Sequence, residues 1–377
     1  MMPFIDLSNR PAELKIKIKI AINKVLKHNQ FIMGEEVYKF EKKLEQFCCV
    51  KNAITCSNGT DALFITLLAL NVKKTDAIFI PSFTFVATVE SVMLAGGTPI
   101  FIDVLHCSFN IDSNSLMDGI KIAKAKKLTP KYIIAVDLFG MPANYKDLEN
   151  IVNKYDIKLI VDAAQSFGAS YMGRKVGSIG FVTITSFFPT KPLGCFGDGG
   201  CIFTNDEELS KNIKSIRNHG QGKDKYENIR IGLNSRLDTI QAAILLEKLE
   251  YVNNEIEMKN NLATYYNEIL ENFVEIPKVP NYIKTAWAQY TIKLKHHHDR
   301  SEIMNFLKIQ LVPTTIYYSI PLHKQKAYEN CLRVENILKV SEYLSNKVLS
   351  LPMYPYMTNK NKILIFKALK KTFKKYN

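Results

Sequence analysis

The amino-acid sequence predicts an α/β protein with a mostly parallel sheet, followed by a smaller α+β domain. Through the first two thirds of the 377 residues, short β-like and helix-like segments alternate, as they do in parallel sheets. From residue 237 the pattern changes to a long amphipathic helical stretch and then to shorter mixed segments. We therefore expect a large domain over residues 1–245 and a small α+β domain over residues 246–377.

The predicted elements follow one another closely along the chain. In the large domain we expect a loop and helix over 57–70, a strand over 76–82, a helix ended by glycine over 85–97 and a strand over 98–104. Next come a strand over 131–140, a helix over 144–156, a strand and loop over 157–168, and strands over 181–188 and 199–206. The stretch 237–270 predicts a helical bridge to the small domain, whose segments cover 286–295, 301–310, 314–320 and 341–352.

Composition narrows the class of protein. No stretch approaches the roughly 18 apolar residues of a membrane span, and the N-terminus lacks the apolar core of a secretory signal. The seven cysteines are irregularly spaced and contain no CxxC pair, so we expect free thiols in a reducing cytoplasm. The net charge of +14 fits nucleic acid, an anionic membrane surface or polyanionic small substrates, and does not choose among them.

A run of three histidines, His296 to His298, lies between a strand-like and a helix-like segment, where a turn belongs. Consecutive side chains on regular structure cannot all face one ion. We therefore expect a solvated loop there and no metal site.

Two residues that follow apolar strands are candidates for chemistry. Asp162 ends the run IKLIV, and ligands of open α/β sheets collect at the carboxyl ends of strands; the alternative is a helix N-cap. Gln165 is close enough in sequence to lie beside the same ligand. Lys191, in SFFPTKPLG, follows another apolar strand, and burial there would lower the lysine pKa and leave a nucleophilic amine; the alternative is a surface lysine.

Two further features are typical of a site for a flat phosphorylated ligand. The segment Ser57 to Asp61 opens a helix with hydroxyls and a glycine, which favours phosphate binding, although an ordinary capped helix has the same signature. Ser186, five residues before Lys191, offers another hydroxyl. Phe85, in PSFTFVAT, can stack on a ring or pack in the core.

Pyridoxal phosphate requires these parts together. It needs an acid for its pyridine nitrogen, a lysine for its aldehyde, a phosphate cradle and a stacking face. Because all four occur in a plausible α/β order, the joint prediction is stronger than any single one: Lys191 is the Schiff-base lysine of a pyridoxal-phosphate-dependent aminotransferase.

The sequence motifs of the chain resemble those of a known family. The segments FIDL, SNGTDAL, PSFTFVAT, VDAAQSFGA, SFFPTKPLGCFGDGG, RNHGQ and GLNSRLDTIQAAIL are similar, in content and order, to the DegT/DnrJ/EryC1/StrS family of nucleotide-sugar aminotransferases. The resemblance covers nearly the whole chain. It implies the aspartate aminotransferase-like fold of pyridoxal-phosphate enzymes (fold type I), and a cytoplasmic homodimer with active sites at the subunit interface.

The resemblance also implies roles for particular residues. Lys191 holds the cofactor, which passes through the pyridoxamine form during the cycle. The other cofactor contacts implied are Gly59, Thr60 and Ser186 on the phosphate, Phe85 on the ring face, Asp162 on the ring nitrogen, Gln165 on the ring hydroxyl, and Asn234 reaching the phosphate of the other subunit. Arg236, Tyr317 and His323 resemble substrate-binding residues.

The implied reaction moves an amino group from glutamate to a keto sugar linked to a nucleotide diphosphate, releasing 2-oxoglutarate. The related dehydratases typically carry histidine in place of the lysine, so Lys191 favours transamination. The motifs most resemble enzymes that aminate C3 of UDP-linked 3-keto N-acetylhexosamines or hexuronates for surface polysaccharide such as O-antigen. dTDP-linked 3-keto-6-deoxyhexoses are the close alternative, and 4-keto sugars come after them.

Two other functions, regulation through DNA binding and dinucleotide binding, fit the sequence less well. A non-catalytic regulator that binds DNA is disfavoured because family-like sequence leaves no room for a separate helix-turn-helix domain, so we expect no nucleic acid partner and no membrane partner. The segment GCFGDGG does not match the G-x-G-x-x-G pattern of a dinucleotide loop.

Overall fold

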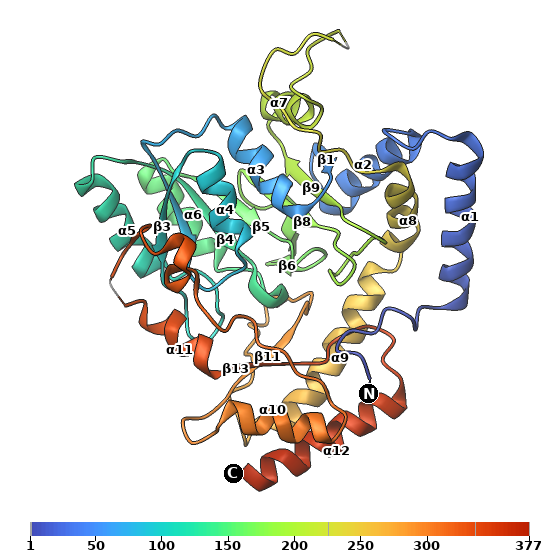
Figure 1. The fold of residues 1–377 in the computed structure, drawn as a ribbon, viewed down its shortest axis with the longest axis vertical. Helices are drawn as coiled ribbons and strands as arrows, with labels where there is room; N and C mark the ends of the chain where they lie inside the picture. The colour runs from blue at the N-terminus through green and yellow to red at the C-terminus, as the bar shows by residue number, and fades with distance from the viewer. Residues whose placement is uncertain (1, 225, 336, 377) are drawn as a thin grey trace.

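The centre of the molecule is an eight-stranded sheet (Figure 1). The computed structural model describes residues 2–224, 226–335 and 337–376. In spatial order the strands are β1 (Asn52–Cys56), β9 (Gly200–Thr204), β8 (Val182–Ser186), β5 (Lys158–Asp162), β4 (Thr129–Val136), β2 (Asp76–Pro81), β3 (Thr98–Ile102) and β12 (Leu332–Arg333). From β8 to β12 every pair is parallel, and β9 is antiparallel to both its neighbours. The predicted α/β fold with a mostly parallel sheet is confirmed.

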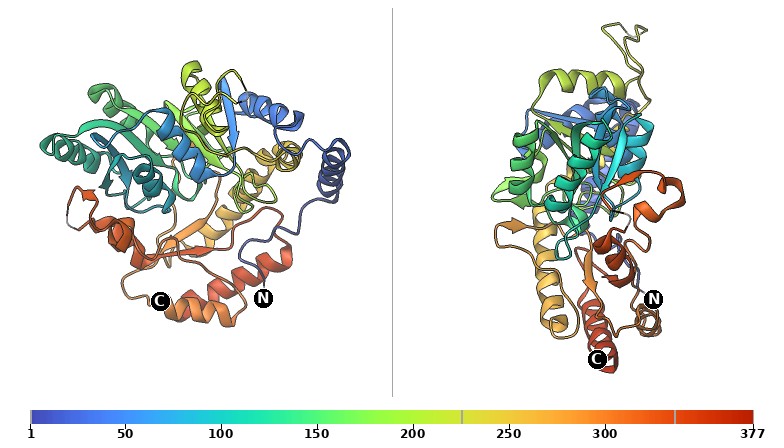
Figure 2. Two further views of the ribbon diagram at one scale, coloured as in Figure 1. Left: turned by 45° about the horizontal axis from the view of Figure 1, so that its top comes forward. Right: turned by 90° about the vertical axis from the view of Figure 1, so that its left-hand side faces the viewer.

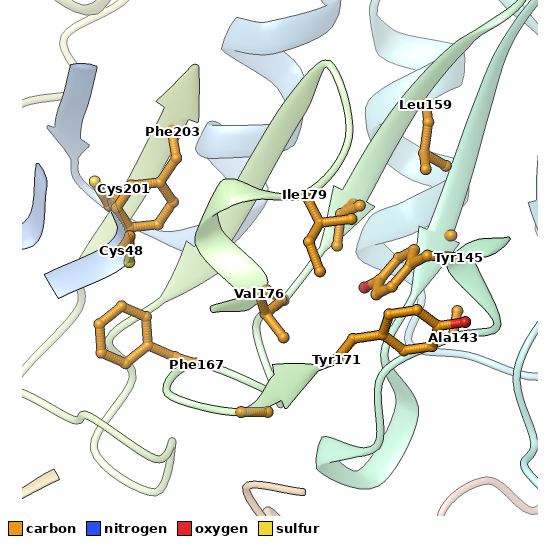
Figure 3. Packing of buried hydrophobic residues seen from close by; sticks show 14 of the residues in the cluster. Cys48, Ala143, Tyr145, Leu159, Phe167, Tyr171, Val176, Ile179, Cys201 and Phe203 are labelled. Carbon is orange, nitrogen blue, oxygen red and sulfur yellow. The ribbon is translucent and has the colours of Figure 1, made fainter. Parts of the chain in front are cut away.

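Helices cover both faces of this sheet, and alternate strand residues supply two separate cores. Ile160 and Val161, for example, belong to opposite cores, as the two-residue repeat of a strand requires. One core includes residues of α2 (Glu35–Cys48), α5 (Ser113–Ala125), α6 (Tyr145–Tyr155) and α8 (Thr239–Leu249); the other includes residues of α3 (Gly59–Ala69), α4 (Ala87–Leu94) and α7 (Glu207–Arg217). Figure 3 shows part of the first core, where Phe167 lies near Phe203 and Cys48.

The helical stretch predicted over 237–270 forms two helices, α8 and α9 (Val252–Leu270). Beyond them, the antiparallel strands β11 (Tyr290–Lys293) and β13 (Val348–Leu351) pack with α9, α10 (Arg300–Ile309) and α12 (Asn359–Tyr376) in a third core. From this later part of the chain, β12 forms the edge strand of the large sheet and the helix α11 (Lys339–Lys347) packs on its second core. At the other end of the chain, Met2 and Ile5 pack on the third core. The chain thus passes between the large-sheet part and the part around the third core near both of its ends (Figure 2). The domain boundary predicted at residue 245 stays a prediction.

The sequence patterns predicted no element before residue 57, whereas the structure contains α1 (Ala12–His28), α2 and β1 there. The segment KIKIKI in α1 alternates like a strand and hides the helical repeat. Leu14, Ile18 and Val25 face α8, while Ile16 and Ile20 are exposed. Packing against α8 therefore selects the helix over the local alternation.

Three expectations from composition can be compared with the structure. All seven cysteines are free. The histidine run was expected to be a solvated loop, which is wrong for His298: its side chain is 4% exposed, and its Nδ1 accepts a hydrogen bond from the Lys295 amide. Within the described ranges, no three His, Cys, Asp or Glu side chains are grouped so as to hold a metal ion, and no helix is long and apolar enough to cross a membrane.

A buried ion pair joins the edge of the sheet to two helices. Arg217, at the end of α7, lies 2.6 Å from the Glu41 carboxylate of α2 and donates to the Thr55 carbonyl of β1. We expect Arg217→Met to lower the free energy of unfolding by about 3–5 kcal/mol, because it leaves the Glu41 charge buried and unpaired.

Urea unfolding measures this loss. The control is Arg174→Met, which removes the exposed pair with Glu149 and should cost about 1 kcal/mol or less. Equal losses in the two variants would contradict the assignment.

Candidate active site

The carboxyl edge of the parallel strands brings three predicted site residues together. Asp162 is the last residue of β5 and Ser186 the last residue of β8, and these two strands are paired. Lys191 lies in the loop that follows β8. Parallel neighbours end at the same edge of a sheet, so residues far apart in sequence converge there.

The two ionisable groups at this edge act on each other. Burial raises the pKa of Asp162, and the hydrogen bond from the Ala164 amide and the nearby Lys191 charge oppose that rise. Burial likewise lowers the pKa of Lys191, against the attraction of Asp162. Lys191 is half-buried and lies beside Asp162, which argues against an ordinary surface lysine. The alternative of a helix N-cap for Asp162 is excluded because residues 164–168 form a turn.

The loop that opens α3 comes close to the end of β8. A Cβ atom added to Gly59 would lie 2.7 Å from the Ser186 Cβ atom, so only glycine permits this approach. The helix is also capped in the ordinary way, since the Asn58 side chain accepts a hydrogen bond from the Asp61 amide at 2.7 Å. The start of α3, with its backbone amides, therefore lies close to Ser186, and the N-terminus of a helix favours anions.

The segment 234–236 approaches the same loop. The Ser235 hydroxyl lies 2.9 Å from the Ser57 hydroxyl, a contact that the sequence did not predict. The neighbouring Asn234 side chain is exposed. Arg236 is half-buried and donates to the Asn218 side chain at 2.9 Å, while its Nε atom is buried without a hydrogen-bond partner.

Phe85 is 53% exposed, so the alternative that it packs in the core is excluded. Its ring lies 6.3 Å from that of Tyr318, whose hydroxyl accepts a long hydrogen bond, 3.4 Å, from Gln165 Nε2. The side-chain oxygen of Gln165, Oε1, accepts a hydrogen bond from the backbone N–H of Phe139 at 2.6 Å. Tyr318 is thus a site residue that sequence reasoning missed, because the choice between adjacent tyrosines depends on tertiary packing.

The two predicted residues of the second domain lie in different surroundings. Tyr317 is half-buried and its ring lies 6.3 Å from that of Phe4. His323 was expected to line a sugar pocket, but it is 1% exposed, with Nδ1 2.6 Å from the Ser82 hydroxyl and Nε2 3.0 Å from Glu342. Both ring nitrogens of His323 thus have partners within the protein, and its place in a sugar pocket stays a prediction.

These residues fit pyridoxal phosphate. A buried carboxylate and a half-buried lysine share one edge of the sheet, and an exposed aromatic ring lies in the segment after β2. The glycine at position 59 leaves open the place that a Cβ atom would fill. Together with the sheet order, this arrangement defines a pyridoxal-phosphate-dependent enzyme of fold type I.

Comparison with known proteins makes the class more specific. A sequence model of the DegT/DnrJ/EryC1/StrS aminotransferase family matches residues 13–370, and the chain belongs to this family. It is an aminotransferase, and its cofactor is pyridoxal phosphate.

Individual relatives match over nearly the full length. A Pseudomonas aeruginosa protein named UDP-2-acetamido-2-deoxy-3-oxo-D-glucuronate aminotransferase is 42% identical over 98% of this chain and 99% of its own. A dTDP-3-amino-3,6-dideoxy-alpha-D-galactopyranose transaminase of Aneurinibacillus thermoaerophilus is 35% identical over 95% and 96%. The crystal structure of a family aminotransferase from Brucella abortus has a TM-score of 0.95 at 42% identity, covering 99% of this chain and all of that chain.

The approach of Gly59 to Ser186 can be tested by substitution. We expect Gly59→Ala to lower the free energy of unfolding of the apoprotein by about 1–3 kcal/mol, the usual cost of an overpacked contact. Adding Ser186→Gly removes the facing Cβ atom and should restore part of that stability. Thermal and urea unfolding measure both effects, and a Gly59→Ala protein of unchanged stability would show that the two segments are farther apart.

Proposed function

We propose that this enzyme transfers the amino group of glutamate to C3 of a UDP-linked 3-keto N-acetylhexuronate, in the synthesis of surface polysaccharide. The observation that carries this proposal is the 42% identity, over 98% of the chain, to a relative named for that type of substrate. The dTDP-sugar relative is 35% identical, so dTDP-linked 3-keto-6-deoxyhexoses remain the second candidate. The net charge of +14 suits either nucleotide sugar, since both are polyanions.

We propose these roles for the site residues. Ser186, Thr60 and the backbone at Gly59 hold the phosphate, Phe85 covers one face of the ring, and Gln165 contacts the ring hydroxyl. Arg236 is proposed to pair with the diphosphate or with a sugar carboxylate; its buried Nε atom without a partner supports this role. Tyr317 is proposed to line the sugar pocket, whereas the buried, doubly bonded position of His323 supports only an indirect contribution there.

The chemistry divides between the cofactor and the chain. When bound, pyridoxal phosphate supplies an electron sink for the carbanion that forms at the substrate carbon. Asp162 keeps the ring nitrogen protonated, which its burial away from water strengthens. Lys191, whose pKa burial lowers, has a greater share of neutral amine at neutral pH. With the cofactor bound, this amine would carry the proton between the two carbons of the 1,3-shift in each half-reaction.

We also propose that the enzyme works as a cytoplasmic homodimer. The segments 219–224 and 226–232 project from the body of the chain (Figures 1 and 2), and Ile229 and Ile231 are 54% and 89% exposed. Exposed apolar side chains on a projecting segment are typical of an interface. The exposed Asn234 directly after this segment supports its predicted contact with the phosphate of a second subunit.

A substrate panel tests the proposed function. Enzyme loaded with an amino group by glutamate is mixed with UDP- and dTDP-linked sugars that carry a keto group at C3 or C4, and loss of the pyridoxamine absorption is followed. We expect the UDP-linked 3-keto hexuronate to react fastest. A faster reaction with a dTDP-linked sugar would replace the first candidate by the second.

The central lysine can be tested separately. We expect Lys191→Ala to bind the cofactor and to lose at least about 100-fold of the transamination rate, the range for a general acid–base group. The control Lys175→Ala removes a half-buried lysine that donates to the Gly168 carbonyl, and should keep its rate. Wild-type turnover by the Lys191→Ala enzyme would refute the assignment.

A further inference from the structure

A small cavity lies beside Lys191 where the two domains and the N-terminal segment meet. Its volume is about 50 Å³, and its walls come from residues 5–10, the loop at 189–192, the helices α8 and α9, Trp287 and residues 353–356. This space is too small for a whole amino acid or sugar. It suits a carboxylate group or a few water molecules.

Cationic side chains outnumber carboxylates around this cavity. Apart from Lys191, the proposed cofactor lysine, its walls contain the cations Arg10, Lys248 and Lys259 and the carboxylates Asp6 and Glu255. The Asp6 carboxylate already accepts hydrogen bonds from Ser8 and Asn9. The cavity wall therefore carries excess positive charge, and its Lys248, Glu255 and Lys259 side chains are buried.

Like Lys191, Lys259 has no direct hydrogen-bond or ion-pair partner for its ammonium group among the residues that the structure describes, and the Glu255 charge attracts it only at longer range. Its side chain is 4% exposed. Lys248 differs, since it donates to the Gly194 carbonyl, and the Arg10 guanidinium lies 5.1 Å from the centre of the Phe196 ring. Burying a charge without a direct partner is costly, so a buried ammonium group at a cavity wall favours the binding of an anion there.

The electrostatics agree with this geometry. Burial lowers the pKa of Lys259 to about 8, against the attraction of Glu255. The pKa of Lys248 is also lowered to about 8, by burial and by the charge of Arg10. An anion in the cavity would raise the pKa of both Lys248 and Lys259, because it favours the charged form of each lysine.

We infer that this cavity binds a carboxylate of a substrate and that Lys259 provides the charge that pairs with it. The inference rests on the proposed function, which offers two sources of this group. One is the carboxylate of glutamate or 2-oxoglutarate, and the other is the carboxylate of a hexuronate. In either case Lys259 determines specificity without taking part in bond breaking.

The test compares three ligands on the holoenzyme by calorimetry: glutarate for the amino donor, UDP-glucuronate for the sugar, and UDP-glucose as the sugar without a carboxylate. Lys259→Met keeps the length and apolar body of the side chain and removes the charge. We expect it to raise the Kd of one carboxylate ligand by about 30-fold or more, as truncation of a buried charge pair does. The affinity for UDP-glucose should not change.

Two further variants control for damage to the fold. Glu255→Gln removes a negative charge from the cavity wall and should lower the Kd of the same ligand, an effect opposite in sign to that of Lys259→Met. Lys175→Met, outside the cavity, should change nothing.

The possible results distinguish glutamate from the hexuronate as the source of the carboxylate. They also distinguish failure of the cavity assignment from failure of the proposed function. Weaker glutarate binding identifies the amino donor, and weaker binding of UDP-glucuronate alone identifies the sugar. Unchanged affinities for both in Lys259→Met and Glu255→Gln overturn the cavity assignment, even if the wild-type enzyme transaminates. A wild-type enzyme that accepts no amino group from glutamate refutes the proposed function instead.

Discussion

The burial of two ionisable groups at one edge of the sheet is the constraint on which the rest of the site depends. Asp162 and Lys191 are placed there by strands β5 and β8, which are parallel neighbours and so end side by side. Burial disfavours the charged form of each, and each partly offsets the cost for the other. Such an arrangement is costly in an empty protein and becomes favourable when a ligand supplies matching charge.

Close backbone approaches hold the loop that opens α3 in place. Gly59 faces Ser186, and a Cβ atom on Gly200 would lie 2.4 Å from the Asn58 carbonyl oxygen. Strand β9, which contains Gly200, is antiparallel to its neighbours and lies between β8 and β1. The antiparallel strand β9 thus also positions the loop that opens α3, because it packs directly against that loop.

The C-terminal part contributes to the site by packing around it. Tyr318 reaches Gln165 and approaches the Phe85 ring, and His323 joins Ser82, directly after β2, to Glu342 on α11. A buried histidine with both nitrogens engaged transmits the position of one element to another. The cavity beside Lys191 is a second junction of this kind, where the N-terminal segment and α9 complete a wall that the large sheet leaves open.

The sequence by itself determined the fold class, the cofactor and the family, because the strand–helix alternation is local and the motif around Lys191 is specific. It also placed Asp162 correctly at a strand end. Only the tertiary structure decided that α1 is a helix despite its strand-like alternation, that Tyr318 is the tyrosine that contacts Gln165, and that His298 and His323 are buried. These outcomes depend on which surfaces meet across long sequence separations. The same is true of Lys259: in the sequence it is one lysine among many, and only the folded chain places it at a cavity wall formed with four segments distant in sequence.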